Sequence, residues 1–284
     1  MNELTTVVGT ERICVRTAGD TIHVTLDDPQ TRNAVSRTMY HELAFVLSQI
    51  AGRQDLRFVV LGGAGGVFSS GGDLRELADG LPDDYVTDYW QRMSGTILTL
   101  RAMPQIVIAG VRGAAVGAGA AVALASDMVV MERDARMRFT FTRIGFLPDA
   151  GTTVMLPRLL GPAIARDLLF TGRWIGAEEA CHRGMVARVC EPGAVDDTVD
   201  DLIAELRHSP AGALGMVKNL VDASALGDLT SGVRAEGVQQ YAAAASGEYR
   251  EYLARVLAVM AGPSAPATPA TDPDPDADVT IKSH

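Results

Sequence analysis

Two short apolar runs, each ending in a glycine-rich turn, constrain this chain more than any other feature of its sequence. The first, at residues 58–61, leads into a loop with glycines at 62–63, 65–66 and 71–72. The second, at 106–111, leads into an alanine- and glycine-rich segment that starts at residue 113. Short apolar runs bounded by glycine are typical of buried strands. We therefore expect two strand–loop–helix units in an α/β core of stacked repeats.

Glycine suits these turns because it adopts positive φ and lets another group approach the main chain closely. The helix expected after each loop would present unpaired N–H groups and the positive end of its dipole. Two such donors aimed at one point stabilise a carbonyl oxygen that becomes an enolate. The alternative is that the glycines only make tight turns and close helix packing. A Rossmann dinucleotide site is disfavoured, since Gly113, Gly117 and Gly119 miss the G-x-G-x-x-G spacing.

The remaining periodicity completes the α/β pattern. Residues 13–16 and 21–26, separated by Gly19 and Asp20, predict a β-hairpin, and residues 128–131 predict a further strand. A helix capped by Ser36 is expected to run to Ala51. It should bury five side chains, which are Leu43, Phe45, Val46, Leu47 and Ile50. After residue 156 the spacing predicts helices over 162–171, 177–184, 195–208, 209–225 and 231–260.

Composition limits the class of function. The chain has 284 residues and 47% hydrophobic content, enough to bury a sizeable core. Its net charge of -10 argues against nucleic acid or an anionic membrane as the main partner. Cys14, Cys181 and Cys190 form no C-x-x-C pair and the five histidines are scattered, so we expect no metal site and a reducing compartment. The first eleven residues lack the features of a signal peptide, and we predict a cytoplasmic protein.

Four sequence blocks carry a resemblance to a known family. They are D-P-Q-T-R-N-A-V at 28–35, F-S-S-G-G-D-L at 68–74, G-A-A-V-G-A-G-A at 113–120 and R-I-G-F-L-P-D-A-G-T at 143–152. In these blocks the chain resembles the crotonase (enoyl-CoA hydratase/isomerase) superfamily, and the match extends in order over residues 11–260. The resemblance implies an α/β fold, namely a crotonase-like spiral of β-β-α repeats with a C-terminal helical region.

We expect four regions along the chain. They are a flexible N-terminus at 1–10, the crotonase-like spiral core at 11–206, the C-terminal helical region at 207–261 and a tail at 262–284. The tail is rich in Ala, Pro, Thr and Asp and cannot bury enough apolar surface to order itself, so we expect it to be disordered. The resemblance also implies a homotrimer or a dimer of trimers.

The resemblance implies an acyl-CoA thioester as the substrate. CoA enters as part of that substrate, so no separate cofactor is expected. The backbone N–H groups of Gly72 and Ala118 fall where the family forms its oxyanion hole. Six further residues fall where the family lines its CoA and thioester channel, and these are Arg32, Ala34, Ser70, Gly71, Asp73 and Leu74. The resemblance therefore predicts that an arginine-lined entrance, and not overall charge, holds the CoA.

Hydratases of this family carry two glutamates that activate water, and this chain has Ala121 and Phe141 at the corresponding positions. Neither side chain can move a proton. Asp149 remains, where isomerase-like and dehalogenase-like members of the family carry a catalytic aspartate. Its apolar neighbours at 146–147 and 150–151 predict a carboxylate with a raised pKa that acts as a base. The alternative interpretation is that Asp149 is a helix N-cap.

Glu76, the other carboxylate nearby, is interpreted as a solvated charge on a helix. One base beside an oxyanion hole suffices for a 1,3-proton shift. The leading hypothesis is therefore an enoyl-CoA isomerase that uses Asp149 as its base. The first alternative is an enoyl-CoA hydratase or lyase that recruits water through Asp149 alone. The second is a catalytically silent acyl-CoA-binding subunit, suggested by Ala121 and Phe141.

Overall fold

The computed structural model describes residues 5–6, 10–78, 83–209, 211–225, 230, 233–234, 237–238, 241 and 248–261. The tail expected to be disordered, at 262–284, and most of the N-terminus expected to be flexible lie outside these residues. No helix within the described ranges is long and apolar enough to cross a bilayer. The boundary between a core at 11–206 and a helical region at 207–261 stays a prediction.

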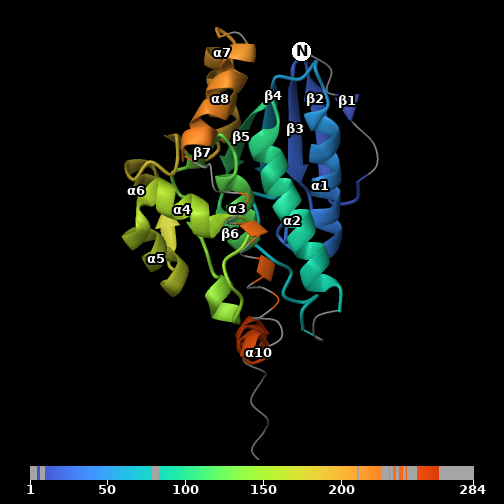
Figure 1. Cartoon of the computed structure of the whole chain (residues 1–284), viewed down its shortest axis with the longest axis vertical. Coiled ribbons are helices and arrows are strands. Elements are labelled where there is room, and N and C mark those ends of the chain that lie inside the picture. Colours follow the sequence, from blue (N-terminus) through green and yellow to red (C-terminus); the bar gives the residue numbers. More distant parts are fainter. Residues whose placement is uncertain are drawn as a thin grey trace, which may run out of the picture.

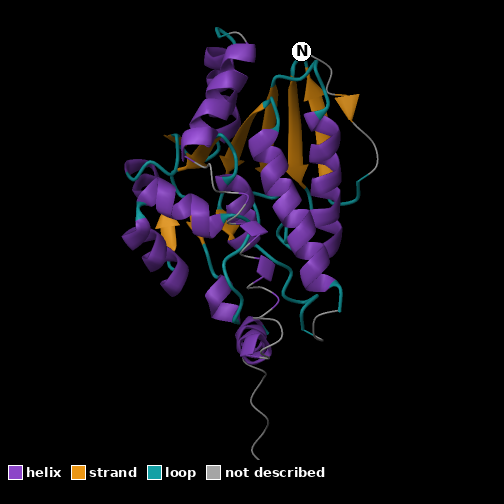
Figure 2. Ribbon diagram, viewed as in Figure 1, coloured by secondary structure: helices purple, strands orange, loops and turns teal. Residues whose placement is uncertain are grey.

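A seven-stranded sheet forms the frame of the molecule (Figure 1, Figure 2). Its strands, in spatial order, are β1 (Thr5–Thr6), β2 (Ile13–Ala18), β3 (Thr21–Leu26), β4 (Phe58–Gly63), β5 (Ile106–Val111), β7 (Met128–Glu132) and β10 (Arg188–Cys190). β2 and β3 are antiparallel, which confirms the predicted hairpin. From β3 onward all neighbouring strands are parallel. Parallel neighbours need crossover connections, and helices run in those connections.

A second sheet of three strands contains β6 (Ala114–Val116), β8 (Arg136–Arg138) and β9 (Trp174–Gly176). The helices of the described ranges are α1 (Arg37–Ala51), α2 (Tyr85–Ala102), α3 (Gly117–Leu124), α4 (Thr152–Leu160), α5 (Pro162–Thr171), α6 (Ala177–His182), α7 (Val195–Leu206), α8 (Ala211–Ala225) and α10 (Glu248–Met260). A 3-10 turn, η1 (Phe141–Ile144), precedes α4. The order β2-β3-α1 recurs as β5-β6-α3, so successive β-β-α units build the spiral that the sequence predicts.

Alternate residues of β4 face two different cores, which explains why its sequence is continuously apolar. Phe58 and Val60 pack in a cluster with residues of α7. Val59 and Leu61 belong to the main core, which α1 and α2 cover from the opposite face of the sheet (Figure 1). Side chains of a strand alternate between its two faces, and a parallel strand buried on both faces reads as an unbroken apolar run. The apolar run at 58–61 is therefore a central strand of the sheet.

Two details of the sequence prediction are wrong. Phe45 is 59% exposed, because it lies two residues from Leu43 and so on the far side of α1 from the core. Glu76 does not lie on a helix, since residues 74–78 form turns and α2 begins only at Tyr85. The Glu76 carboxylate instead accepts the backbone N–H of Arg37, the first residue of α1, at 2.9 Å. This pairs a negative charge with the positive end of that helix.

The two glycine-rich loops pack against each other at Ser69 and Gly119. Backbone N–H groups of Ser69 and Val116 donate to the partner loop, each at 3.0 Å. The Ser69 hydroxyl donates to the carbonyl oxygen of Asn33 at 2.7 Å and accepts the N–H of Gly71 at 3.2 Å. A Cβ on Gly119 would lie 2.3 Å from the Cβ of Ser69. Residue 119 must therefore be glycine for α3 to lie this close to the first loop.

We expect Gly119→Ala to lower the free energy of unfolding by about 2 kcal/mol, because the new methyl group overpacks the contact with Ser69. Urea unfolding followed by circular dichroism would measure the change. Gly95→Ala is the matched control, since Gly95 is exposed in α2 and a Cβ there meets nothing within 4 Å. The control should gain about 0.5 kcal/mol from helix propensity. Equal unfolding curves for Gly119→Ala and the wild type would contradict the packing argument.

Candidate active site

A cavity of about 880 Å³ opens beside the two loops. Seven of the nine residues predicted to form the site line it, and these are Arg32, Ala34, Ser70, Gly71, Gly72, Asp73 and Leu74. Ala118 and Asp149 are not among the lining residues, and both are buried, at 2% and 3% exposed. The structure therefore gathers most of the predicted residues at one cavity. The chemical role of each residue stays a prediction.

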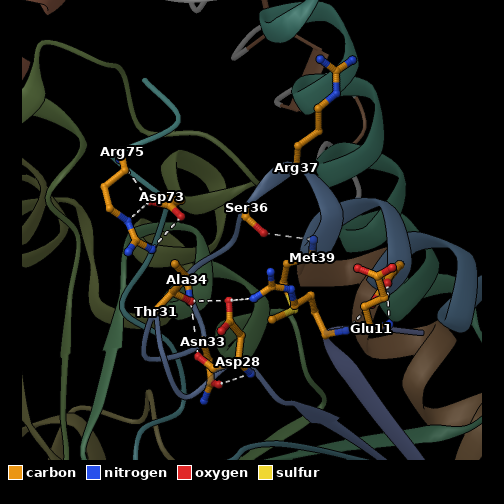
Figure 3. Close-up of polar contacts among 12 residues, drawn as sticks. Glu11, Asp28, Thr31, Asn33, Ala34, Ser36, Arg37, Met39, Asp73 and Arg75 are labelled. Atoms are coloured by element: carbon orange, nitrogen blue, oxygen red, sulfur yellow. Dashed lines mark hydrogen bonds and ion pairs between the residues drawn. The ribbon is translucent and has the colours of Figure 1, made fainter. Parts of the chain in front are cut away.

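The loop at 28–36 holds its cavity residues by side chain to backbone hydrogen bonds (Figure 3). The Asn33 amide oxygen accepts the N–H of Asp28 at 2.9 Å, and its amide nitrogen donates to the carbonyls of Ala64 and Val67 at 2.9 and 2.8 Å. Arg32 and Asn33 both adopt positive φ, at 59° and 57°. Such a conformation is uncommon outside glycine, and asparagine tolerates it best. Asn33, which the sequence analysis left without a role, thus fixes the backbone that carries Arg32.

The predicted oxyanion residues lie on different kinds of local structure. Ala118 is the second residue of α3, where the first-turn N–H groups have no intrahelical partner and the helix dipole is positive. Gly72 forms an isolated parallel bridge with Val35, whose N–H donates to the Gly71 carbonyl at 2.7 Å. The helix expected directly after this loop is not there, because residues 74–78 form turns. Within the described chain, neither Gly72 nor Ala118 donates its backbone N–H to another residue.

Asp149 lies in the turn between η1 and α4. Its backbone carbonyl accepts the Thr152 N–H at 3.0 Å and the Thr152 hydroxyl at 2.8 Å. The N-cap position of α4 is held by Gly151, at φ 77°, and has no side-chain cap hydrogen bond. The alternative that Asp149 is the N-cap is therefore wrong. Its buried side chain is hydrogen-bonded instead to Tyr89, a residue of α2 that the sequence analysis did not identify.

Two tyrosines of α2 lie near enough to Asp149 to feel its charge, and the phenol groups of both stay protonated. Burial raises the pKa of Tyr89 well above its ordinary value, and the charge of Asp149 and the nearby Tyr85 add to this effect. Burial also raises the pKa of Tyr85, with further contributions from the charges of Glu76, Asp149 and Asp73. Both phenols are therefore hydrogen-bond donors at neutral pH. The neighbourhood of Asp149 is aromatic as well as aliphatic, which the apolar residues beside it in the sequence did not indicate.

The positions of the two absent glutamates hold apolar side chains in the structure as well. Ala121 is fully buried in α3, one turn beyond Ala118. Phe141, at the start of η1, lines the cavity. Asp73 also lines it, but its carboxylate forms an ion pair with Arg75 at 3.0 Å (Figure 3). No group of three or more metal-binding side chains occurs among the described residues.

The cavity wall is basic although the chain is acidic overall. Five arginines line it, and these are Arg32, Arg75, Arg138, Arg143 and Arg255. Burial lowers the pKa of Arg138, and the positive charges of Arg143 and Arg136 lower it further. In the part of the chain that the structure describes, no carboxylate lies within ion-pair distance of Arg32, Arg138 or Arg143. This wall can therefore receive an anionic ligand.

An aromatic face accompanies these arginines. The guanidinium carbons of Arg136 and Arg138 lie 4.2 and 5.1 Å from the ring centroid of Trp174 in β9. α10 packs on η1 and adds the exposed apolar side chains of Val259 and Met260 to the lining. The sequence analysis assigned none of these residues to the site, because they come from segments that only the fold brings together.

Comparison with known proteins agrees with this geometry. The family model for enoyl-CoA hydratase/isomerase matches residues 16–255. The 1,2-epoxyphenylacetyl-CoA isomerase of Escherichia coli K12 is 32% identical over 238 residues, which is 83% of this chain and 91% of that protein. A probable enoyl-CoA hydratase of Rhodobacter capsulatus is 34% identical over 229 residues, 80% of this chain and 88% of the relative. An enoyl-CoA hydratase structure from Mycobacterium avium subsp. paratuberculosis superposes with a TM-score of 0.81 at 25% identity, over 88% of this chain and 97% of that one. The chain therefore belongs to the enoyl-CoA hydratase/isomerase family and has the crotonase fold.

Proposed function

We propose that this acyl-CoA-processing enzyme is an enoyl-CoA isomerase that moves a double bond with Asp149 as its base. One observation carries the proposal. A single buried carboxylate lies at the Asp149 position, while the positions of the two hydratase glutamates hold Ala121 and Phe141. A proton shift needs one base that takes a proton and returns it. Hydration by a pair of carboxylates needs groups that this site lacks.

In the proposed reaction the thioester carbonyl oxygen accepts the backbone N–H groups of Gly72 and Ala118. Asp149 removes a proton from C2, and the electron pair of that bond moves into the thioester to form a dienolate. The two N–H donors stabilise the negative oxygen at this stage. Asp149 then returns the proton to C4, so the double bond moves from C3–C4 to C2–C3. No atom is gained or lost, and no cofactor beyond the substrate's own CoA takes part.

The arginine wall supports binding of CoA. A CoA ester carries several phosphate charges, and arginine pairs with phosphate through short, charge-assisted hydrogen bonds. The net charge of -10 would repel a CoA ester, so the arginines of this wall supply the positive charge that its phosphates need. The apolar side chains of Phe141, Val259 and Met260 in the same lining suit the uncharged part of the ligand. This division of the lining favours an amphipathic thioester over a small polar metabolite.

Relatives are named both ways, as an isomerase and as a hydratase. The second candidate is therefore a hydratase or lyase that uses Asp149 alone, and its mark would be solvent oxygen in a 3-hydroxyacyl product. The third candidate is a silent acyl-CoA-binding subunit. It would bind CoA esters tightly and would convert none of a broad set of acyl-CoA substrates. Isomerisation without incorporation of solvent oxygen distinguishes the leading proposal from both.

We expect Asp149→Asn to lower kcat on 3-enoyl-CoA substrates by about 10³-fold, because the amide cannot accept the C2 proton. KM should change little, since Asp149 is not among the residues that line the cavity. The measurement is the absorbance of the 2-enoyl thioester as it forms. Asp167→Asn is the matched control, because Asp167 is an exposed carboxylate paired with Arg173. Unchanged turnover in Asp149→Asn would remove this residue from the mechanism.

We expect Arg32→Gln to raise KM for acyl-CoA about tenfold through the loss of one charged contact to phosphate. kcat should stay close to that of the wild type, and the difference in KM should shrink at high salt because of screening. Arg133→Gln is the control, since Arg133 is an exposed residue paired with Glu178 and Glu191. Steady-state kinetics at two ionic strengths would measure both variants. An unchanged KM would contradict a role of Arg32 in the entrance.

The homotrimer or dimer of trimers also stays a proposal. An apolar stripe on α8 supports it, since four exposed side chains at helical spacing face one side, and these are Met216, Val217, Leu220 and Val221. Sedimentation should give three or six times the 30.0 kDa chain mass. Leu220→Glu should reduce that mass, whereas Phe45→Glu, which changes an isolated exposed side chain on α1, should not. A monomeric wild type would contradict the proposal.

Cytoplasmic location remains a prediction from the sequence.

A further inference from the structure

Tyr89 reaches Asp149 from a different part of the chain. It lies in the first half of α2, sixty residues before Asp149, and the two side chains are joined by a hydrogen bond. Asp149 is 3% exposed and Tyr89 is 9% exposed. A carboxylate this deeply buried depends on the protein for its hydrogen-bond partners. The phenol of Tyr89 is one such partner, and nothing in the proposed proton shift yet uses it.

The ring of Tyr89 is held on two sides. It stacks on Tyr85, with ring centroids 5.8 Å apart and an interplanar angle of 3°. It also meets Tyr40 of α1 edge to face, at 5.3 Å and 84°. The Tyr40 hydroxyl is itself fixed, because it donates to Asp88 at 2.8 Å. Because Tyr85 and Tyr40 both pack against this ring, the position of the Tyr89 phenol oxygen is fixed.

The charges around this group leave Tyr89 as a donor. The charge of Asp149 acts on Tyr89 directly, and the charges of Glu76, Asp73 and Arg37 reach the neighbouring Tyr85. A buried phenol beside a carboxylate keeps its proton, so the hydrogen bond runs from the phenol O–H to a carboxylate oxygen. Such a bond fixes the carboxylate in one orientation. It also stabilises the charged form and so limits how basic the carboxylate becomes.

We propose that Tyr89 is a positioning residue for the base: its phenol O–H holds one oxygen of the Asp149 carboxylate and leaves the other oxygen to take the substrate's C2 proton. This inference rests on the function proposed above and deepens it. A base held by a donor on a rigid element stays in reach of both C2 and C4 as the proton is taken and returned. Tyr89 itself does not touch the reacting atoms.

The test compares Tyr89→Phe with Tyr85→Phe in the full-length chain, on 3-enoyl-CoA. Both variants keep an aromatic ring in the stack and each removes one buried phenol. We expect Tyr89→Phe to lower kcat about 30-fold with KM little changed. The acid limb of its kcat/KM profile should move to higher pH, because the carboxylate loses a donor to its charged form. Tyr85→Phe should keep both kcat and the position of that limb.

Three outcomes would overturn the assignment. The first is a Tyr89→Phe enzyme with the kcat and pH profile of the wild type. The second is an equal loss in Tyr89→Phe and Tyr85→Phe, which would indicate general damage to the aromatic stack. The third is a loss of activity in Tyr89→Phe that is fully explained by its lower folded fraction, as measured by urea unfolding, with an unchanged pH profile.

Asp149→Asn separates failure of this inference from failure of the proposed function. If Asp149→Asn is inactive while Tyr89→Phe is fully active, the base stands and only the positioning role is lost. If Asp149→Asn is fully active, the proposed function fails and the positioning role fails with it. The double variant Asp149→Asn/Tyr89→Phe should be no slower than Asp149→Asn alone, because Tyr89 acts only through the carboxylate.

Discussion

The contact between Ser69 and Gly119 is the constraint on which the rest of the site depends. It brings the loop after β4 and the start of α3 closer than any side chain at residue 119 would allow. The same serine hydroxyl bridges the Asn33 carbonyl and the Gly71 N–H, so three segments meet at one residue. The relative position of the Gly72 and Ala118 amides follows from this packing. A pair of donors can stabilise one oxygen only if the backbone fixes both.

Charge is used in two opposite ways in this protein. In the core, Lys218 donates to Asp127 at 2.8 Å and to the carbonyls of Leu100 and Gln105, while Arg101 approaches Asp127 at 3.3 Å. Burial raises the pKa of Asp127 and lowers that of Lys218, and the contact between them offsets that effect in both. At the cavity, Arg32, Arg138 and Arg143 have no carboxylate within ion-pair distance among the described residues, whereas Arg75 is paired with Asp73. Paired charge thus stabilises the fold around Asp127, and the charges of these three arginines support the proposed binding of an anionic ligand.

The sequence predicted those parts of the fold that local pattern determines. The hairpin, the apolar strand at 58–61 and the Ser36 cap of α1 each follow from a few neighbouring residues, and all are confirmed. Seven of the residues that the family resemblance assigned to the site line one cavity, because they sit in continuous motifs, and their roles stay a prediction. The predicted burial of Phe45 is wrong, because the apolar face of α1 was predicted to extend further around the helix than it does. An arginine-lined entrance and Arg32 were predicted from the resemblance, but Arg138, Arg143, Trp174 and Tyr89 were not, since each joins the site through a different strand or helix.

The wrongly predicted helix after the first loop has a consequence for the chemistry. Ala118 offers its N–H at a helix start, where the dipole favours a negative oxygen, while Gly72 offers its N–H from an isolated β-bridge without that support. The proposed oxyanion hole would therefore be electrostatically uneven, with its stronger half on α3, beside Ala121. The hydratases of the family carry a glutamate at the position of Ala121, in the first turn and a half of that helix, and this chain has no carboxylate there. With Ala121 in that place, the base of the proposed proton shift is Asp149, whose buried side chain is hydrogen-bonded to Tyr89.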